Sequence, residues 1–212
     1  MLEGYYINLD KREDRKNNIE YIINKYTLFS NIIRFSAIKN TNGAIGCAMS
    51  HYTLLCELEK NTSNENNYII LEDDFLIFNE SNFNMFVNDY NIIKNDDWDL
   101  IVLTPRGDTV KNYNKYINNN FYRIENNQTA TGYIIKKHFI PILKKLFKIG
   151  LENMLRGESP EQNALDQIWK SLQKDNIFLY YKFVFAGQMP GYSDIEKRVT
   201  NYNGRFLNQS LY

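Results

Sequence analysis

Hydrophobic and polar residues alternate along the chain in short blocks of two kinds. Compact apolar runs bounded by polar turns predict β-strands. These runs cover residues 4–10, 31–38, 68–78, 98–103, 120–124, 129–136 and 177–186. Apolar residues spaced three and four positions apart predict amphipathic helices. Such segments cover residues 10–26, 44–60, 81–94, 136–150 and 159–174. Strands that alternate with helices from the start of the chain predict an α/β domain with a mostly parallel central sheet.

The beginnings of two helices carry recognisable capping signals. Asp10 is followed three residues later by Glu13, which is the spacing of a capping box, so Asp10 is predicted to cap the first helix. Ser159 stands directly before a proline and three residues before Gln162, a pattern typical of a helix N-terminus. We therefore predict one continuous helix over residues 159–174.

Length and composition favour a single domain. The chain has 212 residues, of which 43% are hydrophobic, enough for one substantial core. Residues 105–120 show no clear periodicity and are predicted to form a long loop or a weak hairpin. We find no internal repeat and no linker rich in proline or glycine, so residues 1–212 are predicted to form one domain.

Charge and targeting signals narrow the class of protein. The 25 basic and 25 acidic side chains cancel, which gives no general field for nucleic acid or anionic lipid. We see no signal peptide and no apolar stretch of about 18 residues, the length that a membrane span needs. The two cysteines, Cys47 and Cys56, suit a reducing compartment better than a disulfide scaffold. We expect a cytoplasmic protein without a membrane span.

Three consecutive carboxylates end the most hydrophobic run of the chain. Glu72, Asp73 and Asp74 follow the apolar residues 68–71, so they lie at the carboxyl end of a strand, where open α/β sheets bind ligands. Because neighbouring strand residues point to opposite faces, Glu72 and Asp74 are predicted to project together, with Asp73 on the other side.

Such a pair of carboxylates has two interpretations. Two like charges a few ångströms apart favour binding a cation, and oxygen-only ligands suit Mg²⁺ or Mn²⁺. A cation held there would have open positions for a diphosphate and would neutralise the charge that develops as it leaves. The alternative is that the three residues are solvated charges at a strand end.

A second group of polar residues lies on the helix predicted over residues 44–60. Its apolar face is predicted to include Cys47, Ser50 and His51 together with two leucines. A buried serine and histidine need hydrogen-bond partners. Those partners are either the neighbouring backbone or a ligand hydroxyl or phosphate near the positive end of the helix.

Several motifs occur in a fixed order along nearly the whole chain. They are "YYINLDKREDR", "GAIGCAMSH", "ILEDD", "WDLIVL", "TGYIIKKHF" and "GYSDI". This series resembles glycosyltransferase family 25, which includes lipopolysaccharide-type galactosyltransferases and collagen hydroxylysine galactosyltransferases. The sequence departs from the family pattern at Ala44, where a glutamate is common, which puts any role of that carboxylate in doubt.

The resemblance implies a GT-A type, Rossmann-like fold, a UDP-sugar donor and a divalent cation, Mn²⁺ or Mg²⁺. It also implies inversion at the anomeric carbon during transfer of a hexose to a glycan or hydroxylysine-type acceptor. Residues 1–104 would form the nucleotide-sugar half and residues 105–212 the acceptor half with a C-terminal tail. Carried over by position, the metal ligands would be Glu72 and Asp74. The donor-binding residues would be Asn8, Leu9, Arg15, Gly46, Ser50, His51 and Asp73.

An inverting transfer needs a carboxylate base on the acceptor hydroxyl, opposite the leaving diphosphate. We predict Asp166 as this base. It lies on the flank of the helix predicted over residues 159–174, about 110° from the centre of its apolar stripe at roughly 100° per residue. The resemblance also favours an acidic residue in this segment. An ordinary helix-surface aspartate is the alternative.

Two further polar segments bear on the metal site. Gln188 and Asp194 follow the last predicted strand and are the available oxygen donors for completing the metal site, with a flexible lid as the alternative. Asp97 and Asp99 form a D-x-D pattern, but they precede an apolar run and so lie at the opposite end of a strand. We interpret them as a turn and strand start.

Two other classes of function remain open from the sequence. A metal-dependent hydrolase would use the same carboxylates, but a glycosidase needs two carboxyl groups about 5 to 9 Å apart across a sugar, which adjacent strand residues do not favour. A degenerate transferase domain would bind carbohydrate without turnover. The expected partners are a nucleotide sugar and a carbohydrate or glycosylated peptide acceptor, and no nucleic acid is expected. The sequence does not predict the oligomeric state.

Overall fold

The computed structural model describes residues 2–110, 120–193 and 195–202. Its centre is an eight-stranded sheet with the order β2-β1-β3-β8-β5-β9-β7-β6. The strands of this sheet are β1 (Glu3–Asn8), β2 (Asn31–Ser36), β3 (Asn67–Glu72), β5 (Leu100–Val102), β6 (Asp108–Thr109), β7 (Phe121–Glu125), β8 (Gly132–Lys136) and β9 (Phe178–Tyr181).

The sheet is mixed but mostly parallel, as the sequence predicts. Strand β1 runs parallel to both β2 and β3, and β5 runs parallel to β9. Strand β8 is inserted antiparallel between β3 and β5, and β7 runs antiparallel to β9 and β6. The strands β1, β2, β3, β5 and β9 therefore end at one edge, while the chain enters β8 from that edge.

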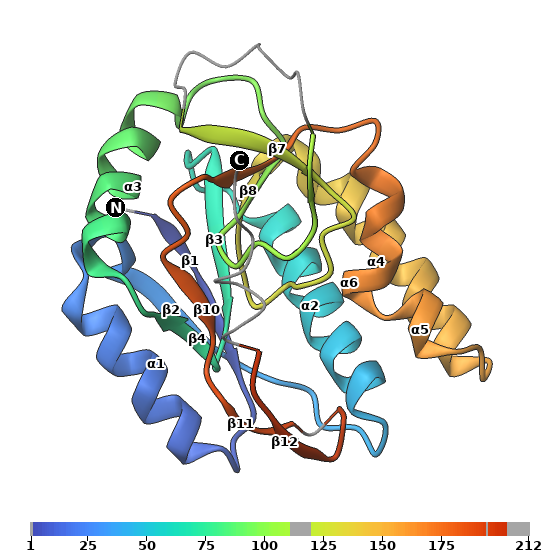
Figure 1. Cartoon of the computed structure of the whole chain (residues 1–212). Helices are drawn as coiled ribbons and strands as arrows, with labels where there is room; N and C mark the ends of the chain where they lie inside the picture. The colour runs from blue at the N-terminus through green and yellow to red at the C-terminus, as the bar shows by residue number, and fades with distance from the viewer. Residues whose placement is uncertain (1, 111–119, 194, 203–212) are drawn as a thin grey trace.

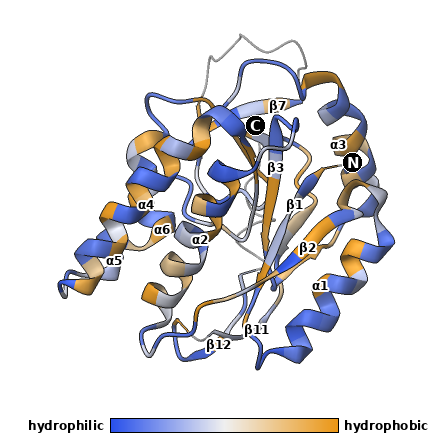
Figure 2. Cartoon of the chain, turned by 180° about the vertical axis from the view of Figure 1, so that it is seen from behind, coloured by the Kyte–Doolittle hydropathy of each residue, from blue (hydrophilic) through white to orange (hydrophobic). Residues whose placement is uncertain are grey.

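Helices cover both faces of the sheet (Figure 1). One face carries α1 (Glu13–Lys25) and α3 (Glu80–Ile93), and the other carries α2 (Gly43–Lys60) and α4 (Ile140–Leu155). Strand β3 shows why: its apolar residues alternate between the two hydrophobic cores, with Tyr68 and Ile70 in one and Ile69 and Leu71 in the other. In Figure 2 the middle of β3 is hydrophobic, whereas α1 and α4 alternate between hydrophobic and hydrophilic residues.

Short elements complete the described chain. Two small sheets pair β4 (Phe75–Ile77) with β10 (Ala186–Gln188) and β11 (Gly191–Ser193) with β12 (Arg198–Thr200). The short helices are α5 (Pro160–Asn163), α6 (Leu165–Ile168), and the 3₁₀ turns η1 (Thr27–Phe29), η2 (Lys137–Phe139) and η3 (Trp169–Leu172). In the part of the chain that the structure describes, no helix has both the length and the apolar character for crossing a membrane.

Three predicted element boundaries differ in the structure. Helix α1 begins at Glu13 without a side-chain cap, because the Asp10 carboxylate instead accepts hydrogen bonds from Arg34 and Ser36 on the neighbouring strand. The strand predicted over residues 68–78 is divided by a turn after Glu72, and its second part, β4, leaves the main sheet to pair with β10. The strand predicted over residues 177–186 is likewise divided into β9, which stays in the main sheet, and β10, which pairs with β4.

The helix predicted over residues 159–174 is broken at Ala164, whose backbone is extended with ψ of 148°. Ser159 does cap the first segment, as predicted. The break follows from the buried Asn163, whose side chain bonds to the Ser159 carbonyl and to Asn153 on α4. The local bond to Ser159 and the tertiary bond to Asn153 together override the helical preference of the sequence. The chain after the break starts a new helix, α6.

Strand β1 packs against β3 so closely that one position accepts only glycine. A Cβ atom on Gly4 would lie 2.0 Å from the carbonyl oxygen of Ile69. Gly4→Ala is therefore expected to destabilise the fold by about 3 kcal/mol, since backbone has to move to relieve the overlap. Urea unfolding followed by circular dichroism measures this change. Gly191→Ala is the control, because no described residue lies within 4 Å of a Cβ built there, and it is expected to leave the midpoint unchanged.

Candidate active site

The acidic triplet lies where β3 ends and the chain turns toward β4. The turn brings Asp73 and Asp74 to the same side. Both carboxylates accept a hydrogen bond from the Nη1 group of Arg15, at 3.1 and 2.9 Å. The predicted alternation, with Asp73 pointing away from Glu72 and Asp74, is therefore wrong. Strand alternation stops at Glu72, and α1 supplies one guanidinium to both aspartates.

Asp73 is held by the end of β1. The buried Asn8 donates from Nδ2 to Asp73 at 2.8 Å and accepts from Arg34 through its own oxygen. Leu9 follows directly, and its carbonyl accepts the Arg12 amide. The structure places Asn8 beside the triplet, where its amide group orients Asp73. A direct contact of Asn8 or Leu9 with a nucleotide stays a prediction.

Among Glu72, Asp74 and Asp166, Asp74 has the pKa that is raised furthest above the ordinary value of its carboxyl group. Burial, followed by the nearby charge of Glu72, raises the pKa of Asp74 to about 7 in spite of the opposing effect of Arg15. Its Oδ2 atom accepts from Arg15 and from Nε2 of Gln188 at 2.9 Å, whereas Oδ1 is buried with no hydrogen-bond partner among the described residues. A buried, unpartnered carboxylate oxygen beside a second carboxylate fits the binding of a hard divalent cation.

Glu72 has a different environment from Asp74. Its Oε1 atom lies 3.2 Å from Nε2 of His51 and accepts from the Cys47 thiol at 3.3 Å, and its Oε2 accepts from Thr131 at 3.4 Å. Burial alone would raise the pKa of Glu72, but the interactions with His51 and Cys47 outweigh it and hold the pKa below its usual value. Glu72 is therefore an anion at neutral pH.

The predicted residues of α2 lie behind the triplet. His51 is fully buried and bonds to Glu72 and to the hydroxyl of Tyr133. Ser50 is satisfied within the protein, since it donates to the Gly46 carbonyl and accepts from the Ile38 amide. A Cβ on Gly46 would lie 2.8 Å from the Ile38 oxygen, so this glycine lets α2 approach the preceding loop. Of the predicted donor-binding residues Gly46, Ser50 and His51, only His51 reaches the triplet directly.

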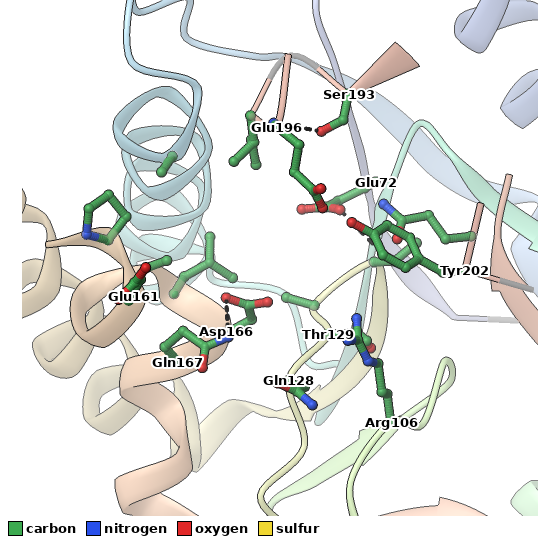
Figure 3. Close-up of a pocket in the computed structure, with 18 of the residues that line it drawn as sticks. Glu72, Arg106, Gln128, Thr129, Glu161, Asp166, Gln167, Ser193, Glu196 and Tyr202 are labelled. Atoms are coloured by element: carbon green, nitrogen blue, oxygen red, sulfur yellow. Dashed lines mark hydrogen bonds between the residues drawn. The ribbon is translucent and has the colours of Figure 1, made fainter. Parts of the chain in front are cut away.

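A cavity of about 630 Å³ opens beside the triplet. Glu72 contributes to its wall from β3 and Asp166 from α6 (Figure 3). Gln188 contributes to the wall from β10. The break at Ala164 explains the position of Asp166, which lies in the first turn of α6. Burial and the charge of Glu72 raise the pKa of Asp166 to about 6. The structure thus brings three residues predicted from the sequence together around one cavity.

Other walls of the cavity come from segments far apart in the sequence. The β11–β12 hairpin is tied to α1, because Arg12 and Arg15 both donate to the Tyr192 carbonyl. Tyr202 packs over the Arg106 guanidinium, 5.3 Å from ring centroid to carbon. The remaining lining residues are Ala44, Gln128, Thr129, Ala130, Thr131, Pro160, Glu161, Ala164, Leu165, Gln167, Ser193, Ile195, Glu196 and Arg198.

Two predictions about acidic residues outside the triplet have different outcomes. Asp194, the second C-terminal candidate ligand, lies outside the described residues. Asp99 accepts the Ile177 amide at 2.7 Å and contacts His138 at the end of the sheet opposite the triplet, consistent with its interpretation as a strand start. Gln188 contacts Asp74 through its amide nitrogen, so its role as a metal ligand stays a prediction.

Sequence reasoning missed Thr131, Arg106 and Tyr202. Thr131 approaches Glu72 because β8 pairs antiparallel with β3, and the Glu72 amide donates to the Thr131 carbonyl. A pairing between strands about 60 positions apart leaves no local mark in the sequence. Arg106 comes from the segment over residues 105–120 that the sequence predicts as a long loop or weak hairpin, and no local pattern marks it as a site residue.

Comparisons with known proteins agree with this architecture. A family model described as glycosyltransferase family 25 (LPS biosynthesis protein) matches residues 35–151, just over half of the chain. No curated protein matches the sequence.

Among solved structures, the chain resembles a glycosyltransferase involved in the glycosylation of the major capsid of PBCV-1. The TM-score is 0.53 at 13% identity, with 92% of this chain and 96% of that chain covered. It also resembles A197 from STIV, with TM-score 0.43, 12% identity, and coverage of 94% and 93%. A third is mannose-1-phosphate geranyltransferase from Thermus thermophilus, with TM-score 0.41, 10% identity, and coverage of 97% and 64%.

The first of these likenesses identifies the fold as GT-A type, as the sequence motifs imply. The family match, which includes α2, the acidic triplet and β8, identifies the enzyme class as glycosyltransferase. The chain belongs to glycosyltransferase family 25.

Proposed function

We propose that this glycosyltransferase is metal-dependent and inverting, and moves a hexose from a UDP-sugar to a hydroxyl group of a glycan or hydroxylysine-type acceptor. The observation that carries the proposal is the meeting of Glu72 and Asp166 on one cavity, next to the Asp73–Asp74 turn. Residues 1–104 supply the triplet and its partners and are assigned to the donor. Residues 105–212 supply Asp166 and most of the cavity wall and are assigned to the acceptor.

The donor set of the triplet supports a hard divalent cation, Mn²⁺ or Mg²⁺. Glu72 and Asp74 would hold it, with the buried Oδ1 of Asp74 available for coordination. Gln188 and Asp194 are our candidates for a further ligand. When bound, such a cation neutralises negative charge on a leaving diphosphate.

Arg15 adds a fixed positive charge beside the triplet. Its guanidinium bonds to Asp73 and Asp74 and to the Tyr192 carbonyl, so segments from both halves of the chain determine its position. We assign Arg15 to the diphosphate of the donor, whose charge increases during transfer. Asn8 supports this arrangement by holding Asp73.

Asp166 is assigned the role of general base. A carboxyl group with a pKa near 6 is ionised at neutral pH and still accepts a proton more readily than an ordinary aspartate. It takes the proton from the acceptor hydroxyl as the oxygen attacks the sugar. Its position on α6, across the cavity from β3, suits attack from the side opposite the leaving group, which inverts the anomeric carbon.

A donor screen tests this proposal. The protein is incubated with UDP-glucose, UDP-galactose and related donors, with and without Mn²⁺, and UDP release is measured. We expect release with at least one donor, dependent on the cation. Titration of UDP in a calorimeter is expected to give binding heat only with Mn²⁺. Indifference to UDP, or carbohydrate binding with no cation dependence, would contradict the proposal and favour a hydrolase or a degenerate binding domain, respectively.

A further inference from the structure

Three side chains of different chemistry converge behind the acidic turn. Cys47 and His51 are one helical turn apart on α2, and Glu72 ends β3 beside them. One ligand atom from each residue, Sγ, a ring nitrogen and a carboxylate oxygen, lies within 4.8 Å of the other two. Both other atoms approach the same oxygen, Oε1 of Glu72, at 3.2 Å from His51 Nε2 and 3.3 Å from Cys47 Sγ.

We propose that Cys47, His51 and Glu72 form a second cation site, selective for a borderline-soft ion such as Zn²⁺. Sulfur, imidazole nitrogen and carboxylate oxygen are the usual zinc ligands, with bonds of about 2.0 to 2.3 Å. In a tetrahedron with such bonds the ligand atoms are about 3.3 to 3.7 Å apart, close to the two separations from Glu72 Oε1, and the third pair, Cys47 and His51, lies within 4.8 Å. Binding forms one bond from each residue to the ion and releases the thiol proton to solvent.

The surroundings of His51 support a ligand role. The Tyr133 hydroxyl lies 3.0 Å from Nδ1, and the two rings are stacked with their centroids 5.9 Å apart. In the metal-free protein Nε2–H faces the Glu72 carboxylate, so zinc binding requires the ring proton on Nδ1 instead, where it is donated to the Tyr133 hydroxyl and leaves the electron pair of Nε2 free for the ion. Histidines that bind metals are commonly oriented by such a partner at the other ring nitrogen.

The site has three protein ligands and one direction open to solvent. His51 is fully buried, whereas the Glu72 side chain is 22% exposed and forms part of the cavity wall. Within this proposal we place the fourth coordination position on the side of Glu72, the ligand that borders the cavity. A three-ligand site with an open position takes water or a ligand group in place of the fourth ligand.

The two cation sites differ in chemistry but share Glu72. The proposed hard-cation site uses only oxygen donors, whereas this one adds sulfur and nitrogen, which favour Zn²⁺ over Mg²⁺ or Mn²⁺. On the basis of the proposed function, zinc at Cys47 and His51 would withdraw Glu72 from the diphosphate site. We therefore expect micromolar-range or tighter zinc to inhibit transfer, with excess Mn²⁺ restoring it only in part.

Cobalt(II) is the probe for the site, because a cobalt–thiolate bond gives a charge-transfer absorption that an all-oxygen site lacks. Titration of the full chain with Co²⁺ is expected to develop this band to one equivalent, and Zn²⁺ is expected to abolish it. Cys47→Ser is expected to remove the band. Cys56→Ser, which removes the other thiol, is the matched control and is expected to retain it.

A second variant tests the ligand geometry without removing a ligand. Tyr133→Phe deletes only the hydroxyl next to His51 and is expected to weaken zinc binding by about 10- to 100-fold in competition with a chromophoric chelator. Absence of the thiolate band in the wild type, its loss in Cys56→Ser, or its persistence in Cys47→Ser would overturn the proposal. A cobalt band in a protein that fails to bind UDP with Mn²⁺ would instead preserve this site and refute the proposed function.

Discussion

Replacement of Asp166 by asparagine is expected to lower the rate of sugar transfer by about 10²- to 10⁴-fold, the usual contribution of a general base. Asparagine has nearly the same shape but does not accept a proton, so the cavity and the triplet remain intact. Transfer is measured as UDP release in the presence of acceptor and Mn²⁺. UDP binding by calorimetry is expected to match that of the wild type, since Asp166 acts on the acceptor.

The matched control is Glu161→Gln on α5. Glu161 is an exposed carboxylate on the wall of the same cavity, and its replacement removes one charge without removing the proposed base. We expect its rate to stay within about threefold of the wild type, as for most surface substitutions. Comparable losses in both variants would mean that the rate depends on the charge of the cavity and would contradict the assignment of Asp166.

Asp74→Asn is expected to abolish cation-dependent transfer and at the same time stabilise the metal-free protein. In the folded state the pKa of Asp74 is about 7, against about 3.9 in an unfolded chain. Between these values the folded protein binds a proton that the unfolded chain has released. The contribution of Asp74 to stability is therefore largest below about pH 4 and decreases as pH rises toward 7.

Ionising the buried Asp74 carboxyl group above pH 7 costs free energy in the folded state, and asparagine removes this cost because it does not ionise. At pH 8 without metal we expect the free energy of unfolding to increase by about 2 kcal/mol, with a smaller difference near pH 4. Urea denaturation at both pH values, in the presence of a chelator, measures the change. Asp10→Asn is the control, an aspartate outside the triplet that also contacts an arginine. A variant less stable than the wild type at pH 8 would contradict this prediction. It would mean that the ionised Asp74 carboxylate is well solvated or that Arg15 fully offsets the cost of burying its charge.

The sequence predicts the fold where the pattern is local. The four apolar residues before Glu72 identify a buried strand, and the leucines of α2 identify the helix beside it, because each periodicity directly reflects burial on one or two faces. The break at Ala164 cannot be predicted from the hydrophobic periodicity. It depends in part on a hydrogen bond between Asn163 and Asn153 on another helix, which opposes favourable helical propensity.

The same distinction applies to the candidate site. Glu72 can be placed near a ligand-binding edge because it ends a buried strand, and Asp166 is predicted because the family resemblance favours an acidic residue in its segment; the structure brings both to one cavity, and their roles stay predictions. The position of Asp73 beside Asp74 could not be predicted from strand alternation, since a turn replaces the strand geometry after Glu72. The contact of Tyr133 with His51 depends on the antiparallel insertion of β8 into the sheet, which only the folded chain displays.

The most direct test of the account is a crystal structure of the protein with Mn²⁺ and UDP, in which the anomalous signal locates the ion. We expect the manganese peak within bonding distance of the Asp74 carboxylate and of the UDP diphosphate, with Asp166 facing the sugar side of the cavity. UDP bound elsewhere, or a manganese ion that leaves Glu72 and Asp74 uncoordinated, would contradict the claim that this acidic turn holds the donor.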